Sequence, residues 1–393
     1  MFQTLQAQPA DPLLALISLF QDDPRDGKLD LGVGTYRDER GITPVMGAVK
    51  EAERMLVASQ RTKAYLGVEG DRRFVDLVGS VAFGAPTCAF AGRLTGVQTP
   101  GGSGALRLGA ELIAAARPGA RVWVGTPTWP NHHAILDAVG LSVAAYRYHD
   151  PATQSLCLEE MLAALSRAQP GDVVLLHGCC HNPTGAELNE NAWGTVIGVL
   201  AERGLVPFID LAYQGLGRGL DADAEATRRV LASVEEALVA YSCDKNFGLY
   251  RERTGALFAL ARDAEGAEVV RGVMLNLARA NWSMPPDHGA AVVRGVLESE
   301  ELGRLWREEL GGMCRRIGAV RHTLAAAEPR LSFLCRQRGM FSQLPIARAA
   351  IAALRGEHGI YMASSGRINV AGLRAGDARR FVDALAAVGG LSA

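Results

Sequence analysis

Short apolar segments alternate with longer helical stretches along the middle of the chain, from about residue 93 to 265. Several of the short segments are continuous apolar runs, which is typical of strands that are buried on both faces of a parallel sheet. The alternation predicts an α/β fold in which helices flank a mostly parallel central sheet and ligands bind at the carboxyl ends of the strands. The expected strands are 94–98, 121–126, 172–176, 205–209, 237–242 and 255–260, and the expected helices include 106–116, 193–202 and 224–236.

A second, smaller α/β domain is expected in the last third of the chain. Apolar residues recur mostly every three or four positions over 299–327, which predicts one long amphipathic helix. Strand-like segments follow at 330–334 and 366–371, and a final helix is expected at 377–388. The first 15 or so residues are expected to form either a packed arm or a frayed terminus.

The composition argues against several classes of protein. The chain has 393 residues with a formal net charge of -1, so it lacks the electrostatic footprint of a nucleic-acid binder or of a polybasic membrane-surface protein. No apolar run approaches the ~20 residues that a membrane-spanning helix needs, and the N-terminal sequence does not resemble a signal peptide. Seven scattered cysteines do not form the pattern of a disulfide framework, which favours a reducing, cytoplasmic location.

Only four of the 41 basic residues are lysines, which shortens the list of candidates for chemistry that needs an amine. Lys245 follows the apolar strand 237–242 in the sequence Ser-Cys-Asp-Lys-Asn-Phe-Gly, whereas Lys28, Lys50 and Lys63 lie in polar or charged stretches. Burial at a strand end favours the neutral amine that carbonyl condensation requires. The alternative interpretation is a surface lysine in a loop.

A glycine-rich turn, Thr-Pro-Gly-Gly-Ser-Gly-Ala-Leu-Arg at 99–107, connects an expected strand to an expected helix. Such a turn offers free backbone N–H groups and a favourable helix dipole to a phosphate. The alternatives are a plain tight turn and a dinucleotide site. The glycine spacing is not G-x-G-x-x-G, and the next strand does not end in the acid that would bind a ribose.

The segment His-Gly-Cys-Cys-His-Asn-Pro-Thr-Gly at 177–185 closes another expected strand. Its histidines and cysteines suggest zinc, but adjacent cysteines lack the C-x₂-C spacing and no second ligand pair lies at a fitting distance. We therefore expect no metal here. The segment is interpreted as an ordered turn that presents the side-chain amide of Asn182.

Polar or aromatic residues follow two further strands. Asp210 comes directly after 205–209, where a buried carboxylate needs a cation or several donors; its alternative role is the N-cap of the next helix. Trp129 follows 121–126, where it either stacks on a planar ring or fills the core. With Tyr213, the chain offers an amine, a phosphate site, an acid, a phenol, an amide and an aromatic face, a set that indicates pyridoxal 5′-phosphate.

These motifs resemble those of the class I aminotransferases, specifically the aspartate and aromatic amino-acid aminotransferases. The likeness runs from Leu31 to Leu373, and its most specific motifs are HNPTG, SxxKNFGLYxER and SGRIN. The resemblance implies fold type I of the pyridoxal-phosphate enzymes and a homodimer with shared active sites. It also implies three regions: 1–45 as an N-terminal arm with part of the small domain, 46–300 as the large cofactor-binding domain, and 301–393 as the small C-terminal domain.

The resemblance assigns roles around the cofactor by matching position. It implies that Lys245 binds the cofactor covalently and moves the proton, that Asp210 pairs with the pyridine nitrogen, and that His132 supports Asp210. Trp129 would stack on the ring, while Tyr213 and Asn182 would contact the ring hydroxyl. The implied phosphate ligands are Gly102, Ser103, Ser242, Arg253 and, from the neighbouring subunit, Tyr65. Where the family often has serine before the lysine, this chain has Asp244, whose charge would repel the phosphate unless the side chain turns toward Arg253 or Arg251.

The resemblance also implies a substrate site. Arg367 matches the arginine that holds the α-carboxylate, Arg279 the one that crosses the interface to a distal carboxylate, and Gly34 a loop glycine near the substrate, beside Asn182 and Trp129. Ala64 and Met284 stand where aspartate-preferring members often carry asparagine, and with Trp282 they make the pocket walls less polar. This favours an aromatic amino-acid aminotransferase that moves the amino group of Tyr, Phe or Trp, and also of Asp, to 2-oxoglutarate by a ping-pong mechanism.

Four alternatives remain at this stage. An aspartate aminotransferase and a pyridoxal-phosphate β-lyase would use the same scaffold. A nicotinamide oxidoreductase would explain the glycine-rich turn but would leave Lys245, Asp210 and both carboxylate-binding arginines without roles. A non-catalytic paralogue would be expected to lose Lys245 or Asp210, and the chain keeps both.

Overall fold

The computed structural model describes residues 1–6, 12–84, 90 and 92–390. Within them, one mixed sheet consists of the strands β2 (Leu94–Pro100), β3 (Arg121–Thr126), β4 (Ser142–Arg147), β7 (Val173–His177), β8 (Val206–Leu211), β9 (Ala237–Ser242) and β10 (Thr254–Leu260). Their order across the sheet is β2-β10-β9-β8-β7-β3-β4. β10 is antiparallel to both of its neighbours, and the other pairs are parallel, as the apolar runs predicted.

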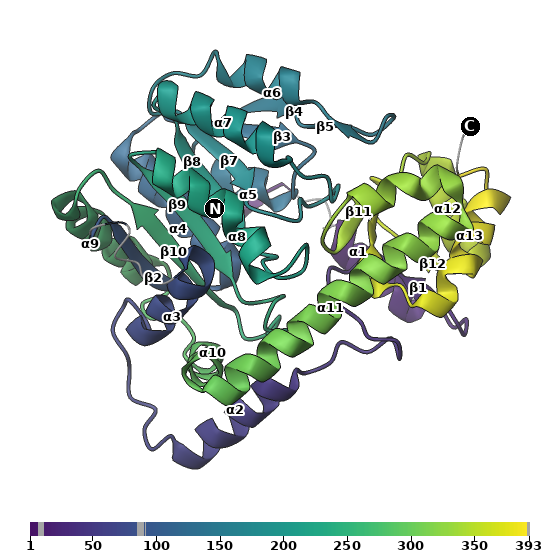
Figure 1. The fold of residues 1–393 in the computed structure, drawn as a ribbon, viewed down its shortest axis with the longest axis horizontal. Helices are drawn as coiled ribbons and strands as arrows, with labels where there is room; N and C mark the ends of the chain where they lie inside the picture. The colour runs from purple at the N-terminus through teal and green to yellow at the C-terminus, as the bar shows by residue number, and fades with distance from the viewer. Residues whose placement is uncertain (7–11, 85–89, 91, 391–393) are drawn as a thin grey trace.

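Helices cover both faces of this sheet (Figure 1). They are α3 (Arg72–Phe83), α4 (Gly101–Ala116), α5 (Asn131–Asp137), α6 (Leu158–Leu165), α7 (Glu190–Glu202), α8 (Leu220–Ser233), α9 (Ala264–Asn281) and α10 (His288–Glu298), whereas α2 (Gly47–Ser59) lies away from the sheet and packs against α10. Successive residues of one strand belong to different cores: Phe208 of β8 packs in a cluster with α4, α5 and α9, whereas Ile209 packs in a cluster with α3, α7, α8 and α10. This double burial explains why β8 has an apolar sequence on both faces.

The edge strand β4 was missed by the sequence analysis. Its residues are mostly exposed or half-buried, and only Tyr146 is buried, so it lacks the continuous apolar run of the inner strands. The strand predictions at 121–126 and 237–242 coincide with β3 and β9, and the others differ from the observed strands by one or two residues at an end.

The long predicted helix is α11 (Glu300–Ala327), and the hydroxyl of Ser299 caps it by accepting a hydrogen bond from the Leu302 N–H. It runs from α2 and α10 to the C-terminal elements (Figure 1). Strand β1 (Leu29–Asp30) pairs in parallel with β12 (Ile360–Tyr361), which joins the N-terminal segment to this C-terminal part. The remaining elements are α1 (Pro12–Asp22), α12 (Arg348–His358), α13 (Ala378–Ala387), β11 (Phe341–Gln343), β13 (Arg367–Asn369), β5 (His149–Asp150) and β6 (Ser155–Leu156).

The strand predicted at 330–334 is wrong, because Pro329–Arg336 forms a 3₁₀ helix. Pro329 fixes the first helical position and the Glu328 carboxylate accepts a hydrogen bond from the Arg330 N–H, so a proline and an acidic cap start a helix here. The strand predicted at 366–371 is shorter than expected, since β13 ends at Asn369 and a 3₁₀ turn follows.

The two alternatives for the N-terminal 15 residues are tested only in part. Residues 1–6 are exposed and include a 3₁₀ turn at Phe2–Thr4, whereas residues 7–11 lie outside the described residues.

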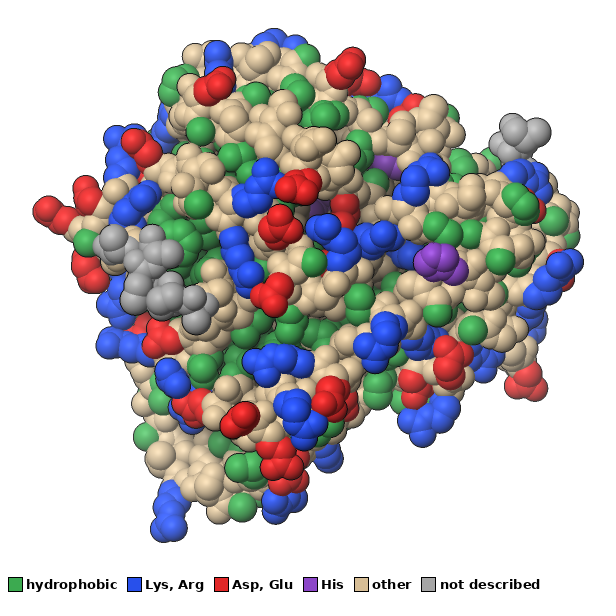
Figure 2. Space-filling view, viewed as in Figure 1, with side chains coloured by type: hydrophobic (Ala, Val, Ile, Leu, Met, Phe, Trp, Pro, Cys, Tyr) green, Lys and Arg blue, Asp and Glu red, His purple; other side chains and the backbone are tan. Residues whose placement is uncertain are grey.

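The six cysteines within the described ranges are free thiols. A search of the described helices finds none with the length and apolar content to cross a membrane. Figure 2 shows acidic and basic side chains interspersed on one face of the molecule.

Candidate active site

The carboxyl ends of three adjacent strands bring the predicted polar residues together. The register pairs His177 at the end of β7 with Asp210 of β8, and Ser242 at the end of β9 with Gly255 of β10. Asp210 lies within β8, and the next helix, α8, begins only at Leu220, so the N-cap alternative for Asp210 is wrong.

Asp210 is a buried carboxylate held by a short chain of hydrogen bonds. Its Oδ2 lies 3.0 Å from His132 Nε2, and His132 Nδ1 lies 2.7 Å from the Thr128 hydroxyl. Burial acts to raise the pKa of Asp210, but the hydrogen bond from His132 and the positive charge of Lys245 outweigh it, so the pKa is lowered. Because an ionised carboxylate only accepts, His132 donates to Asp210 from Nε2. Asp210 therefore presents a fixed negative charge at the sheet edge.

Two further histidines lie behind this pair: His177 is half-buried and His181 is buried. The ring centroids of His132 and His177 are 5.2 Å apart, and those of His177 and His181 are 4.3 Å apart. Burial, with the neighbouring His132, lowers the pKa of His177 from 6.5 to about 3, and its Nε2 has no hydrogen-bond partner. Burial likewise lowers the pKa of His181 well below its ordinary value. Both rings are therefore neutral at physiological pH.

We predict that His177 contributes to the acid sensitivity of the fold. Between pH 6.5 and about 3 the unfolded chain binds a proton at this residue that the folded protein does not, so the free energy of unfolding falls as the pH falls. His177→Asn should reduce the slope of that free energy near pH 5 by up to about 1.4 kcal/mol per pH unit. Urea unfolding at several pH values measures the slope. The exposed His322 provides the control: an unchanged slope in His177→Asn, or an equal reduction in His322→Asn, would contradict the prediction.

Lys245 lies just beyond β9, with its amine above the ring of Tyr213. The Nζ atom is 5.1 Å from the ring centroid and 3.8 Å from Asp244 Oδ2, and the side chain is 19% exposed. This half-buried position rejects the alternative of a surface lysine. Asn182 donates from Nδ2 to the Tyr213 hydroxyl at 3.2 Å, so the predicted phenol and amide meet beside the amine.

The glycine-rich turn leads directly into α4, which starts at Gly101. The residue before it is Pro100, and no side chain caps the first turn of α4, which leaves its N–H groups available to an anion. Gly101 has a φ of +69°, and a Cβ there would lie 2.6 Å from Arg253 Nη2. A Cβ at Gly102 would lie 2.9 Å from Ser242 Cβ. We call Gly102, Ser103, Ser242 and Arg253 the phosphate cradle.

Asp244, which stands where the family often has serine, bonds an arginine of the phosphate cradle. Its Oδ2 accepts a hydrogen bond from Arg253 Nη1 at 2.7 Å, which matches the expectation that this acid turns toward an arginine. Arg253 Nη1 also donates to the Tyr250 carbonyl at 3.1 Å. Asp244 is 5% exposed, and its other oxygen, Oδ1, has no hydrogen-bond partner.

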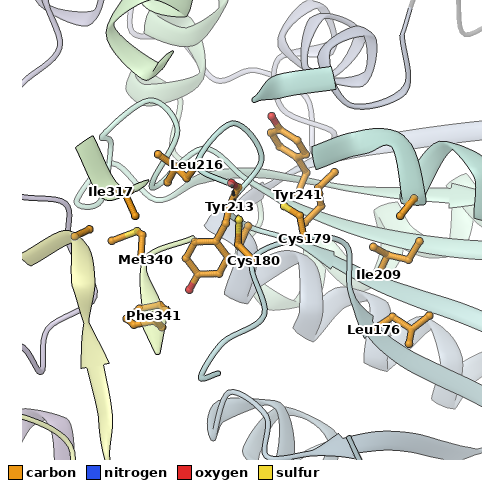
Figure 3. Close-up of a cluster of buried hydrophobic side chains, with 14 of the residues drawn as sticks. Leu176, Cys179, Cys180, Ile209, Tyr213, Leu216, Tyr241, Ile317, Met340 and Phe341 are labelled. Carbon is orange, nitrogen blue, oxygen red and sulfur yellow. Dashed lines mark hydrogen bonds between the residues drawn. The ribbon is translucent and has the colours of Figure 1, made fainter. Parts of the chain in front are cut away.

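Arg367 closes the other side of the site. Its Nη2 donates to the Gly32 carbonyl at 2.9 Å and its Nη1 to Asn182 Oδ1 at 3.4 Å, while the buried Nε has no partner. The guanidinium stacks over the ring of Phe341, 4.6 Å from its centroid. A Cβ at Gly34 would lie 2.8 Å from the same ring, so Gly34 leaves room for Phe341. Figure 3 shows Phe341 next to Tyr213, and their rings meet edge to face.

Phe341 was missed by the sequence analysis, as were Thr128 and Tyr250, whose hydroxyl accepts a hydrogen bond from the Tyr36 N–H at 2.9 Å. Phe341 lies in β11, far along the chain from the motifs of the large sheet, and only folding places it against Arg367 and Tyr213. The apolar pair Met-Phe after Gly339 offered no local signal for that contact.

The structure does not bring every predicted residue to this edge. Tyr65 is 92% exposed, and Arg279, in the last turn of α9, is exposed and donates to the Ser283 hydroxyl at 2.8 Å. Trp129 is half-buried, packs against the cluster on the α4 side of the sheet and meets His132 edge to face, with centroids 5.3 Å apart.

The residues present fit pyridoxal phosphate. For the phosphate, the uncapped N-terminus of α4 and Arg253 lie beside the glycine-rich turn. For the ring, Asp210 supplies a buried ionised carboxylate at the end of β8. For the carbonyl, Lys245 supplies a half-buried amine. A nicotinamide site would need neither the amine nor the buried carboxylate. In the structure Cys179 and Cys180 lie close to Asp223, a third group with a possible metal ligand, but Asp223 already accepts hydrogen bonds from the N–H groups of Gly215, Gly217 and Arg218.

Comparisons with known proteins agree with this geometry. A family model described as "Aminotransferase class I and II" matches residues 26–385. A tyrosine aminotransferase of Rhizobium meliloti (strain 1021) is 52% identical over 383 residues, covering 96% of this chain and 97% of the relative. An aspartate aminotransferase of Salmonella typhi is 42% identical over 395 residues, covering 99% and 100%. A crystal structure of an aromatic-amino-acid aminotransferase from Burkholderia pseudomallei, covalently bound to pyridoxal phosphate, has a TM-score of 0.96 at 40% identity and covers 99% of each chain.

Proposed function

The chain belongs to the class I and II aminotransferases, and from this premise we propose that it transfers amino groups from aromatic amino acids to 2-oxoglutarate. Pyridoxal phosphate is the cofactor that this family uses. One observation supports the assignment most: the Lys245 amine lies over the Tyr213 ring and 3.8 Å from Asp244, the acid that bonds Arg253 of the phosphate cradle, and it is near enough to the buried Asp210 to help lower the pKa of that carboxyl.

When bound, pyridoxal phosphate supplies a carbonyl that condenses with amines and a ring that accepts the electrons of a breaking bond. Asp210 would supply a negative charge to the ring nitrogen, and His132 fixes the direction of that carboxylate. Lys245 Nζ would take and return the proton at the substrate carbon. Tyr213 and Asn182 would hold a ring oxygen. Gly102, Ser103, Ser242 and Arg253 would hold the phosphate.

Arg367 binds the substrate α-carboxylate in our proposal. A guanidinium binds a carboxylate through two parallel hydrogen bonds, and Arg367 is held in place by the Gly32 carbonyl and the Phe341 ring. Its unpartnered Nε supports this role, since a buried donor without an acceptor is costly. Gly34, Asn182 and Trp129 complete the wall around the reacting carbon.

We propose a homodimer because two of the assigned residues lack a local function. Tyr65 is 92% exposed and Arg279 is exposed, which suits residues that reach the phosphate and the distal carboxylate of a second subunit.

The proposed domain boundaries fit two features of the fold. The boundary near residue 45 fits the pairing of β1 with β12, and the boundary near residue 300 fits the start of α11 at Glu300. The buried free thiols of Cys179, Cys180 and Cys243 fit a cytoplasmic location.

The aromatic preference is supported by the sequence of the outer pocket and by the relatives. Ala64 and Met284 offer no amide to a distal carboxylate, and the tyrosine aminotransferase relative is more similar to this chain, at 52% identity, than the aspartate aminotransferase relative, at 42%. Burying an aromatic ring against such walls is worth about 2–3 kcal/mol. The alternative with a specific observation in its favour is an aspartate aminotransferase, because Arg279 is present.

The test compares phenylalanine and aspartate in the first half-reaction. Each amino acid is mixed with the pyridoxal form, and the loss of the visible absorbance band is followed. We expect kcat/KM for phenylalanine to equal or exceed that for aspartate. A preference for aspartate by orders of magnitude would instead identify an aspartate aminotransferase, and failure of both to remove the band would refute both substrates.

Arg279→Leu separates the two substrate classes in the same assay. The variant should lose about 100-fold in kcat/KM for aspartate, because a buried carboxylate would lose its charged partner, while phenylalanine should change less than about threefold. Phenylalanine in the same variant is thus the internal control. An equal loss for both substrates would mean that Arg279 acts on folding or assembly and not on the distal carboxylate.

A further inference from the structure

Asp244 places a buried negative charge inside a site that must bind a phosphate. Its carboxylate lies within 2.7 Å of Arg253 Nη1 and 3.8 Å of Lys245 Nζ, so two cations of the site share one acid. The unpartnered Oδ1 points toward the start of α4, since a Cβ at Gly101 would lie 3.4 Å from it. The first turn of α4 and Arg253 are the two features that make this turn attractive to an anion.

Two effects of Asp244 on a bound phosphate oppose each other. The hydrogen bond to Arg253 orients the guanidinium, which favours phosphate binding. The negative charge repels a phosphate held by the same guanidinium, and neighbouring charges in a buried site are poorly screened by salt. Orientation does not depend on Asp244 alone, because the Tyr250 carbonyl also accepts from Arg253 Nη1, at 3.1 Å, and Arg253 Nη2 packs against Gly101. Part of the orientation would therefore remain without Asp244, whereas the repulsion comes from its charge and would be lost with it.

We propose that Asp244 weakens the hold of the phosphate cradle on the cofactor phosphate, so that this protein exchanges its cofactor faster than it would with an uncharged residue at this position. The inference rests on the proposed function, since it takes Arg253 to be a phosphate ligand. It gives a role to a buried acid that the amino-group transfer itself does not require. With Asp244 present, the phosphate cradle would bind an anion more weakly than Arg253 and the N-terminus of α4 would without this acid.

The experiment compares Asp244→Asn, which keeps the shape and removes the charge, with the parent holoenzyme. The rate of cofactor release is followed by the loss of visible absorbance after rapid desalting, and inorganic phosphate is titrated by calorimetry into the full chain after cofactor removal. We expect the Asp244→Asn variant to release the cofactor about tenfold more slowly and to bind phosphate about tenfold more tightly. Asp244→Ser should change both in the same direction, which guards against a folding artefact in one variant.

Two further variants make the outcomes distinct. Asp221→Asn removes an exposed carboxylate that pairs with Arg228 on α8, and it should leave both readouts unchanged. Arg253→Met should weaken phosphate binding. If Arg253→Met weakens binding but Asp244→Asn leaves it equal or weaker, the inference is overturned and Asp244 serves to orient Arg253. If neither variant changes phosphate binding or cofactor release, the assignment of the phosphate cradle fails, and the inference fails with it.

Discussion

Replacement of Lys245 by alanine is expected to lower kcat by about 10⁴-fold or more while the protein still binds pyridoxal phosphate. A positioned proton-transfer group contributes about 10²–10⁴-fold to a rate, and in the proposed function Lys245 would also bind the cofactor covalently. No other lysine can replace it. Lys28 donates to the Phe20 and Asp23 carbonyls, Lys50 is exposed and pairs with Glu53, and Lys63 is exposed and bonds Gln60.

Steady-state kinetics and absorbance spectra of the purified variant measure this effect. Lys50→Ala is the matched control, because it removes an exposed lysine 3.3 Å from Glu53 and should leave kcat within about twofold. Addition of a small primary amine should restore part of the lost rate in Lys245→Ala, since the missing group is a base and not a structural contact. Normal turnover by Lys245→Ala, or equal loss in Lys50→Ala, would exclude Lys245 as the catalytic amine.

The cofactor side of the site was predictable because each of its residues follows a strand in a local pattern. Lys245 and Asp210 come directly after apolar runs, and parallel strands place their carboxyl ends at one edge, so chain order alone brings them close together. The contact between His132 and Asp210, 78 residues apart, follows from the same rule, because β3 and β8 both pair with β7.

The substrate side was less predictable because it depends on packing between distant segments. Phe341 reaches Arg367 only because β11 pairs with β13, and β11 itself was not predicted. The segment 330–334, which precedes β11, was predicted as a strand. Its apolar residues Leu331, Phe333 and Leu334 are compatible with a strand or a helix, and the cap at Glu328 favours the 3₁₀ helix that is observed. Tyr65 and Arg279 depend on a second subunit in our proposal, which no property of their own surroundings reveals.

Arg321 is the residue whose position is least expected from the sequence. It lies on α11 beside Val320, where a charged residue normally faces solvent, yet it is only 2% exposed. Its guanidinium donates to the Ser342 hydroxyl at 2.7 Å and to the carbonyls of Gly339 and Phe341 at 2.7 Å each, with longer bonds to the carbonyls of Leu334 and Arg338. No acidic side chain among the described residues forms an ion pair with it. Arg321 therefore ties α11 to the segment that leads into β11 and to Phe341 at the start of that strand.

Arg321→Met is expected to lower the free energy of unfolding by about 3 kcal/mol, because methionine fills the space but leaves several buried acceptors without donors. Urea unfolding measures the loss. Arg304→Met is the control on the same helix: Arg304 is exposed and pairs with Glu308, so its replacement should stay within about 0.5 kcal/mol. Arg321→Lys should fall between the two, because one ammonium cannot reach every acceptor that the guanidinium bonds. Since the segment that loses its bonds to Arg321 includes Phe341, whose ring supports Arg367, KM for every carboxylate substrate should rise in Arg321→Met more than kcat falls. A change in stability below about 1 kcal/mol would mean that the hydrogen bonds of Arg321 only offset the cost of burying its charge.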